Sequence, residues 1–502
     1  MQLYFIGILC YNGKMKTTKI KGKFVIGHDG KSHVVYRGGE VVYSGDSIVF
    51  VGRDYDGHVD ETIDSGTSIV GPGFIDLEAD IDTDHALQDV NVEEGRQWCD
   101  LGDKYCTVDF YTDDDFRDRQ TYSIAQLIRN GITTAMPIMG EMFHGWGQTY
   151  REHEIMAEVA LAMGMRLYAG PSFRSFKYVG KDYDKERSEK SFADALRFFD
   201  DFDGKGDGMI RGFINPCQIR WTTADILLRA IRFAESKNAP MRLHACEGVN
   251  EWDYIRTLGG NTTIEYFDKI GLLSKNLLIP HLSVVRNSEI ETVARYGISV
   301  ITTPCAEANW GGALFSFAKL FSYGINVTIG TDCQPLDMIR NMRVARDMDA
   351  VFRNRVVFNR YNEDGSVINT FADEPDYKPM NAGDFYDAAT INGAKALKRD
   401  DIGKLAPGAK ADIIAIDLND ITVGPHEDPI RTMVIACTGN NVSHTIINGK
   451  MLMKDKKLIG IDEQALMRKA QAVYERCLNF NHEHDRYQRP LEAFFPPTYR
   501  YV

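Results

Sequence analysis

The residues best suited to chemistry are acidic and imidazole side chains that lie far apart in the sequence, each after an apolar stretch. Glu78 and Asp80 end an apolar run, and His244, His281 and Asp332 each follow a later one. Imidazole nitrogens and carboxylate oxygens are common ligands of divalent metals in proteins. Their combination predicts a metal site that activates water for hydrolysis.

These residues meet at one place only if parallel strands of one sheet precede them. Short apolar stretches alternate with amphipathic helical segments through the middle of the chain, which is typical of an α/β protein with a (β/α)8 barrel of the TIM type. Polar side chains at the carboxyl ends of barrel strands face the active site. A single such residue is weak evidence for a catalytic site, but several at the same end of successive strands favour one. An open doubly wound sheet is the alternative, but no Gly-x-Gly-x-x-Gly turn follows a strand. The predicted strands are 69–80, 133–139, 166–172, 209–215, 240–246, 276–282, 298–303 and 326–332.

Strand-rich segments flank this middle part. Runs of Val, Ile and Tyr broken by Gly and Asp occur in residues 1–70 and again in 398–460, the pattern of antiparallel sheet. We expect both chain ends to form one small β-sandwich domain, with the catalytic barrel at 71–397 between them. Residues 461–502 are predicted to form a C-terminal helix, over 463–478, and an extended tail. Ser288 and Glu291 have the spacing of a helix-capping box.

The chain resembles the amidohydrolase superfamily, closest to its branch of cytosine/guanine deaminases and triazine chlorohydrolase-like enzymes. The resemblance extends over almost the whole chain except the C-terminal tail, with the motifs in a fixed order. They are Pro72-Gly-Phe-Ile-Asp76, His244-Ala-Cys-Glu247, His281 after Leu-Leu-Ile-Pro280, Thr303-Pro-Cys-Ala-Glu-Ala-Asn309, Ile329-Gly-Thr-Asp332, Thr390-Ile-Asn-Gly-Ala-Lys-Ala-Leu397, Ile402-Gly-Lys-Leu-Ala-Pro-Gly-Ala-Lys-Ala-Asp412 and Ile447-Asn-Gly-Lys450.

Members of this branch bind one divalent metal, usually zinc or iron. The resemblance implies that His244 is a metal ligand and that Asp332 contacts the metal and takes a proton from the bound water. It implies that Glu247 passes this proton to a ring nitrogen of the substrate. It also implies that His281 hydrogen-bonds the attacking water or the developing oxyanion. These roles agree with the general chemistry of metal-assisted hydrolysis.

The first-strand ligands depart from the family pattern, because Glu78 and Asp80 stand where the branch has His-x-His. Oxygen donors also bind metals, so we predict a site of Glu78, Asp80, His244 and Asp332. Three carboxylates around a dication favour harder ions such as Mn²⁺ or Fe²⁺ over zinc and make a bound water less acidic. The expected cofactor is one divalent ion, either zinc, iron or manganese.

Every second residue from Asp76 to Asp84 is acidic. If the strand continues, period two turns these side chains to one side, where a cation must lie among them. Alternatively the strand ends near Asp80, and Asp82 and Asp84 lie in a solvated loop. His85 is a candidate for a displaced imidazole ligand.

Four further residues follow other predicted strands and are candidates to bind the substrate. A planar ring suits aromatic side chains, and a carboxylate or carbonyl suits arginine. For any one of them, packing or solvation of a loop end is the simpler explanation. They are His144, Arg174, Arg220 and Trp221.

Composition excludes several classes of protein. The formal charge of −13 argues against a nucleic-acid partner. No apolar run is long enough to span a bilayer, and the apolar N-terminus lacks the basic region and cleavage site of a signal peptide. Nine cysteines without Cys-x-x-Cys spacing indicate free thiols in a reducing compartment. We expect a cytoplasmic protein with a small-molecule substrate and no nucleic-acid or membrane partner. From the resemblance, we also expect it to be homo-oligomeric.

Three functions compete. The first is a metal-dependent hydrolase of non-peptide C–N bonds that deaminates a nitrogen heterocycle. The second is other chemistry on the same barrel, such as cyclic amide hydrolysis, dechlorination or decarboxylation. The third is a metal-free barrel whose acidic residues bind a cationic ligand.

Overall fold

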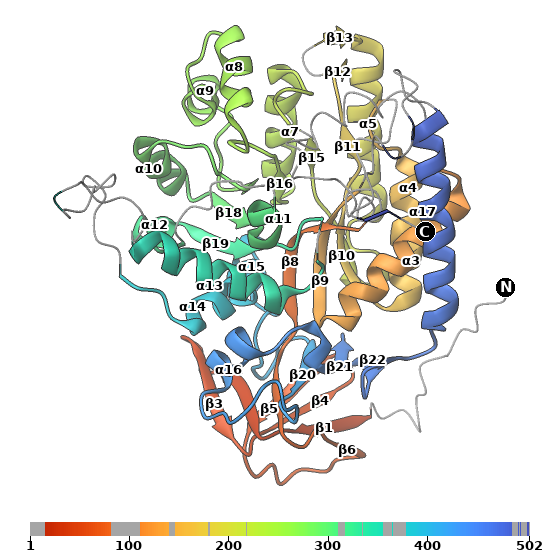
Figure 1. Cartoon of the computed structure of the whole chain (residues 1–502), viewed down its shortest axis with the longest axis vertical. Coiled ribbons are helices and arrows are strands. Elements are labelled where there is room, and N and C mark those ends of the chain that lie inside the picture. Colours follow the sequence, from red (N-terminus) through yellow and green to blue (C-terminus); the bar gives the residue numbers. More distant parts are fainter. Residues whose placement is uncertain are drawn as a thin grey trace.

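The computed structural model describes residues 16–81, 111–139, 146–178, 181–216, 218–309, 317–333, 335–354, 364 and 378–483, with single positions near the C-terminus. Short parallel strands form the centre and helices surround them, while two further sheets lie to one side (Figure 1). These further sheets are built from the two ends of the chain. The site residues are therefore carried by the central strands.

Two four-stranded parallel sheets make up this centre. Two isolated bridges join their edges, one pairing Ile214 with Met241 and the other Ala79 with Asp332. Both sheets also contribute side chains to one buried cluster, which includes Leu77, Met136 and Ile301. The arrangement is a TIM-barrel-like α/β fold, as predicted. The strands are β14 (Ile210–Gly212), β10 (Arg166–Ala169), β9 (Ile132–Ile138) and β8 (Phe74–Asp80) in the first sheet, and β16 (Met241–Arg242), β17 (Leu277–Pro280), β18 (Ser299–Thr302) and β19 (Asn326–Ile329) in the second.

The prediction of one continuous strand over 69–80 is wrong. The structure divides this stretch into β7 (Ser68–Pro72), in a sheet of the chain ends, and β8, in the centre. Gly73 separates them, and a Cβ there would lie 2.0 Å from Cγ2 of Thr133. Only glycine lets the backbone pass β9 this closely.

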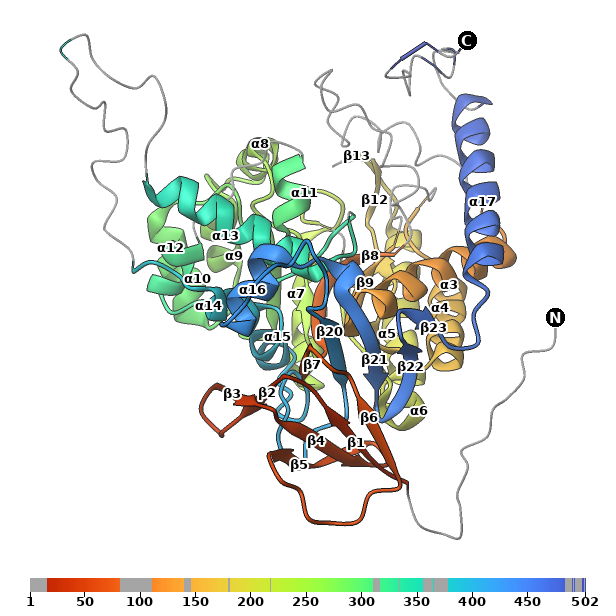
Figure 2. The same ribbon diagram turned by 60° about the horizontal axis from the view of Figure 1, so that its bottom comes forward.

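Helices connect and cover the central strands (Figures 1 and 2). None of the helices in the described ranges is long and apolar enough to cross a membrane. They are α3 (Asp113–Arg129), α4 (Tyr150–Met163), α5 (Lys185–Phe202), α6 (Lys205–Gly208), α7 (Ala224–Ser236), α8 (Val249–Thr257), α9 (Thr263–Ile270), α10 (Asn287–Tyr296), α11 (Pro304–Asn309), α12 (Phe317–Ser322), α13 (Met338–Asn354), α14 (Ala382–Ala388), α15 (Ile391–Ala396), α16 (Pro429–Ala436), the 3₁₀ turn η3 (Gly439–Asn441) and α17 (Glu463–Glu483).

The two sheets from the chain ends share one hydrophobic cluster, to which Ile20, Val41, Val70 and Ile413 contribute. Two-stranded pairs near the centre are β11 (Ser172–Phe173) with β15 (Asn215–Pro216) and β12 (Phe176–Tyr178) with β13 (Lys181–Tyr183). The four-stranded sheet has the order β5 (Ser47–Gly52), β4 (Glu40–Ser44), β1 (Thr17–Lys21), β6 (Glu61–Asp64). The seven-stranded sheet has the order β23 (Lys457–Leu458), β22 (Lys450–Lys454), β21 (Val442–Ile447), β20 (Ile413–Asp417), β7, β2 (Phe24–His28), β3 (His33–Arg37).

The C-terminal helix α17 lies along α3 (Figures 1 and 2). Nζ of Lys469 is 2.6 Å from Oδ1 of Asp118, and Arg476 pairs with Asp115. The predicted helix is present and runs further than expected, to Glu483.

A buried ion pair ties the central strands to the seven-stranded sheet. Arg166, at the start of β10, donates to the carboxylate of Asp412, and both side chains are buried. Asn448 contacts both groups, since its Oδ1 accepts from Arg166 at 3.3 Å and its N–H donates to Asp412 at 2.8 Å. A buried charge that loses its partner is costly, so this pair matters for stability.

We predict that Arg166→Met lowers the free energy of unfolding by about 3–5 kcal/mol, because it leaves the Asp412 carboxylate buried without its cation. Denaturant unfolding followed by circular dichroism measures the change. Lys190→Met is the control, since its ion pair with Asp194 is exposed and exposed pairs contribute about 0.5 kcal/mol or less. Equal losses in the two variants would contradict the assigned role.

Candidate functional site

The carboxyl end of β8 carries Glu78 and Asp80, whose side chains are both buried. The pairing of β8 with β9 shifts register between Asp76 and Ala79, as at a β-bulge. This shift interrupts the strict alternation that period two would give. Asp76 instead accepts hydrogen bonds from the N–H of Thr331, at 3.1 Å, and from its hydroxyl, at 2.6 Å. It thereby ties β8 to the end of β19.

Glu78 contacts two side chains that come from β16 and the residues after it. Its Oε1 lies 2.9 Å from Nε2 of His244, and its Oε2 lies 3.1 Å from Nη1 of Arg242. Burial would raise the pKa of Glu78, but the positive charge of Arg242 and the contact with His244 hold it below its ordinary value. Two residues predicted for the metal site, Glu78 and His244, are thus neighbours.

Arg242 was missed by the sequence analysis. Its guanidinium is fully buried and donates to the backbone carbonyls of Leu77, Met136 and Pro137 at 2.8–3.1 Å. It also lies 5.1 Å from the ring centroid of Phe213. The available signal was its position two residues before His244, because residues two apart on a strand share a face.

Asp332 follows β19 and is held against β8 by the backbone. Its N–H donates to the carbonyl of Glu78 at 2.5 Å, and the N–H of Asp80 donates to its carbonyl at 3.0 Å. Nε2 of His281 is 4.0 Å from Oδ2 of Asp332, and the ring centroids of His281 and His244 are 5.5 Å apart. His281 and Asp332 have φ of 68° and 56°, a costly conformation that clusters at functional sites. The strand ends therefore bring Glu78, His244, His281 and Asp332 next to one another.

The imidazole of His281 is oriented by two residues behind it. Nδ1 lies 3.2 Å from Oγ1 of Thr303 and 3.4 Å from Oε1 of Glu307. Burial opposes the charged form, but the contact with Glu307 and the charges of Glu247 and Asp332 raise the pKa of His281 to about 10. Burial is the main cause that raises the pKa of Asp332 to about 6. A charged imidazole is thus favoured beside a carboxyl group that titrates near neutrality.

Glu247 is fixed by a glutamine that the sequence analysis did not single out. Nε2 of Gln218 donates to Oε2 of Glu247 at 3.0 Å. Arg220 donates to Oε1 of Gln218 from Nε, at 3.0 Å, and from Nη2, at 2.7 Å. Because Arg220 occupies the carbonyl, the amide group of Gln218 faces Glu247. Arg220, predicted to bind substrate, thus contacts the site through Gln218.

The other predicted substrate-binding residues lie as follows. Arg174 and Trp221 are both buried, and the guanidinium carbon of Arg174 is 4.2 Å from the ring centroid of Trp221. Their role in substrate binding stays a prediction. His144 lies outside the described residues, as do Asp82, Asp84 and His85.

The donor atoms at this site have the chemistry that a divalent ion requires. Within the described part of the chain, Oδ2 of Asp332 is buried and accepts no hydrogen bond, while each buried oxygen of Glu78 has one partner, Arg242 or His244. A buried oxygen without a partner is costly unless a cation satisfies it. Among the described residues, no group of three or more His, Cys, Asp or Glu side chains converges closely enough to hold an ion outright. The side chains are thus of the type that binds a divalent ion, and Arg242 lies beside one of them, Glu78.

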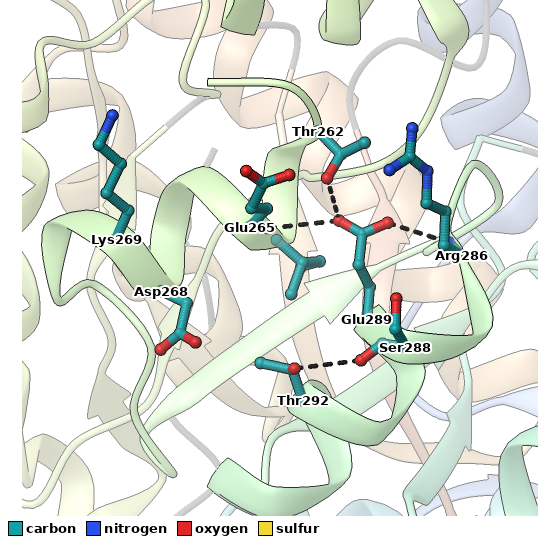
Figure 3. A pocket seen from close by; sticks show the side chains of 9 residues that line it. Thr262, Glu265, Asp268, Lys269, Arg286, Ser288, Glu289 and Thr292 are labelled. Carbon is teal, nitrogen blue, oxygen red and sulfur yellow. Dashed lines mark hydrogen bonds between the residues drawn. The ribbon is translucent and has the colours of Figure 1, made fainter. Parts of the chain in front are cut away.

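A separate polar pocket of about 440 Å³ lies at α9 and α10 (Figure 3). Its Glu289 accepts hydrogen bonds from the hydroxyl of Thr262, at 2.5 Å, and from the N–H of Arg286, at 2.9 Å. The capping box predicted at Ser288 and Glu291 is therefore wrong, because Arg286 and Glu289 form the start of α10. None of the residues predicted for the catalytic site lines this pocket.

The amidohydrolase family model matches residues 69–452. The chain belongs to the amidohydrolase family, and it is a hydrolase that acts on carbon–nitrogen bonds other than peptide bonds. A curated relative from Haloarcula marismortui, named 5-methylthioadenosine/S-adenosylhomocysteine deaminase, is 30% identical. The match covers 72% of this chain and 75% of the relative.

Two solved structures share the fold. An adenosine deaminase from Xanthomonas campestris with bound zinc superposes with a TM-score of 0.77 at 20% identity, covering 91% of this chain and 98% of that one. Atrazine chlorohydrolase from Arthrobacter aurescens TC1 complexed with zinc has a TM-score of 0.72 at 21% identity, covering 91% and 100%. The resemblance to the deaminase and triazine chlorohydrolase branch is confirmed.

Replacing Thr331 with valine tests the tie between β8 and the end of β19. The substitution keeps the shape but removes the hydroxyl that donates to the buried carboxylate of Asp76. We predict a loss of about 1–3 kcal/mol in the free energy of unfolding, measured by denaturant titration. Thr292→Val, which removes a hydroxyl bonded to an exposed backbone carbonyl on α10, should change it by less than about 0.5 kcal/mol. A Thr331 variant as stable as the parent would show that the hydrogen bond to Asp76 does not stabilise the fold.

Proposed function

We propose that this enzyme is a hydrolytic deaminase of a nitrogen heterocycle, with adenine nucleosides as the first candidates. The observation that carries the proposal is the convergence of His244, His281 and Asp332, with Glu247 fixed beside them. The curated relative from Haloarcula marismortui is named for 5-methylthioadenosine and S-adenosylhomocysteine, and the structural neighbour from Xanthomonas for adenosine. Both names describe removal of an amino group from adenine.

His244 and Asp332, with Glu78 and Asp80 from the opening strand, would hold one divalent ion. When bound, such an ion polarises water so that hydroxide forms near neutral pH. The zinc in the structural neighbours supports a divalent cofactor. The three carboxylates of this set favour manganese or iron over zinc. The choice among zinc, iron and manganese is open to direct measurement.

Glu247 is the proposed proton shuttle. It carries a proton from the water to the ring nitrogen next to the carbon under attack, which makes that carbon more electrophilic. The second proton of the water passes to the amino group, which leaves as ammonia. Gln218 holds the carboxylate in one orientation through its amide, and Arg220 holds Gln218. Asp332 accepts the proton of the attacking water. His281, held by Thr303 and Glu307, donates a hydrogen bond to the oxygen that adds to the ring.

The likeness to the two solved structures also supports a more detailed architecture. We propose that the two four-stranded sheets form one (β/α)8 barrel over residues 71–397, with the site at its carboxyl end. The bridges from Ile214 to Met241 and from Ala79 to Asp332 support this closure. Within the domains predicted at 1–70 and 398–460, the described residues would form the β-sandwich, and α17 belongs to the C-terminal extension predicted at 461–502. The predicted extended tail lies almost wholly outside the described residues. The shared cluster between the two end sheets supports the sandwich.

One observation, the ion pair between Glu78 and Arg242, is a reason to consider a reaction other than deamination. The Glu78–Arg242 pair places a fixed positive charge among the ligands, which changes how strongly an attacking water is activated. Of the alternatives, cyclic amide hydrolysis also breaks a C–N bond, whereas dechlorination and decarboxylation do not. Turnover without ammonia release would support one of them.

We predict that Glu247→Gln lowers turnover by about 10²–10⁴-fold, because an amide cannot shuttle the proton. Ammonia release from purine, pyrimidine, pterin and triazine compounds identifies the substrate, and the variant is then assayed on it. Glu265→Gln, an exposed position on α9, is the control and should keep full activity. Undiminished activity of the Glu247 variant would reject the proposed proton shuttle.

We also predict close to one divalent ion per chain in protein purified without chelator, measured by elemental analysis. Removal of the ion should abolish ammonia release, and adding back Mn²⁺, Fe²⁺ or Zn²⁺ should restore it. Full activity in metal-free protein would contradict the proposal and favour a barrel that works without a metal.

A further inference from the structure

The fully buried guanidinium of Arg242 is a feature for which the deaminase proposal gives no role. Guanidinium groups stay charged in proteins, and this one lies 3.1 Å from a carboxylate that the proposed metal site would use. Its hydrogen bonds to the carbonyls of Leu77, Met136 and Pro137 fix it in place. It cannot swing aside without leaving these carbonyls unsatisfied.

Glu78 therefore faces a fixed cation on one side. Its Oε2 is directed to Arg242 and its Oε1 to Nε2 of His244, the imidazole atom available to a metal. Each oxygen of Glu78 thus has one partner, while Oδ2 of Asp332 accepts no hydrogen bond within the described residues. A carboxylate has about four lone-pair sites, so a second cation can share Glu78 with these two partners.

We propose that Arg242 is an internal competitor for Glu78 that sets how tightly the site holds its divalent ion. In the metal-free protein Arg242 neutralises the carboxylate, so the site does not collapse or repel itself. When the ion binds, it shares Glu78 with Arg242 and meets the repulsion of a fixed positive charge. The consequence is a weaker, more exchangeable metal than the acidic ligand set alone would hold. This inference rests on the metal assignment of the proposed function.

The charge of the ligand set determines whether Arg242 raises or lowers the affinity for the divalent ion. Glu78, Asp80 and Asp332 contribute three negative charges, of which Arg242 neutralises one and the charged His281 another. Removing Arg242 makes the ligand set more negative by one charge next to a dication, and cations bind such sites more tightly. Arg242→Gln removes the charge and keeps two of the N–H donors for the three carbonyls that the guanidinium satisfied.

The test is titration calorimetry of metal-free protein with Mn²⁺. Arg242→Gln should lower Kd at least 10-fold relative to the parent. Arg242→Lys, which keeps the charge, should stay within threefold. The matched control is Arg166→Gln, which removes a buried arginine charge that pairs with Asp412, and it should also stay within threefold. An Arg242→Gln variant that binds Mn²⁺ like the parent overturns the inference.

A second variant keeps the inference testable if Arg242→Gln does not fold. Glu78→Gln removes a ligand and leaves the Arg242 charge facing the ion, so Kd should rise at least 100-fold. The rise in melting temperature on adding Mn²⁺ should shrink in parallel. A Glu78→Gln variant with unchanged Kd overturns the inference, because Glu78 would then take no part in binding.

The outcomes separate this inference from the proposed function. A parent protein that binds no Mn²⁺, and no Zn²⁺ in the same experiment, overturns both the metal assignment and the role of Arg242. A parent that binds Mn²⁺ while Arg242→Gln leaves Kd unchanged overturns only the role of Arg242. A shift in Kd as predicted, in a protein that releases no ammonia from any compound, supports Arg242 and rejects the deaminase.

Discussion

The site depends on negative charge buried at the end of β8. A carboxylate with no exposure is unstable unless cations surround it, and Glu78 has Arg242 at 3.1 Å and the His244 imidazole at 2.9 Å. These partners come from a strand far along the sequence. The requirement to pair this charge therefore fixes which strands must lie together. Under the proposed function, a divalent ion would complete the pairing.

Backbone contacts hold this charge in register. The residue pair Ala79 and Asp332 bridges the first and last central strands, and Asp76 bonds Thr331 beside it. Asp332 consequently reaches the site through main-chain geometry and not through a flexible side chain. Positive φ values at His281 and Asp332 indicate that the fold imposes these conformations. A hydrolase gains from such rigidity, because its ligands are positioned before the substrate arrives.

Much of this arrangement was predictable from sequence, because strand-end residues of a barrel converge whatever the intervening chain does. His244, His281 and Asp332 were found in this way. Arg242 was not, because its spacing of two residues from His244 shows only that both share a face of the strand, and its role depends on Glu78 being opposite. Gln218 was missed for a related reason, since it acts only through Glu247. The break at Gly73 depends on contact with a neighbouring strand, which local patterns do not contain.

The most direct test of the account is a crystal structure of protein grown with Mn²⁺, with anomalous diffraction used to locate the ion. If the proposed metal site is correct, one anomalous peak lies within bonding distance of Nε2 of His244 and of the Asp332 carboxylate. The peak should also lie next to the Glu78 oxygen that faces His244. No peak at these atoms, or a single peak elsewhere in the molecule, would contradict the account.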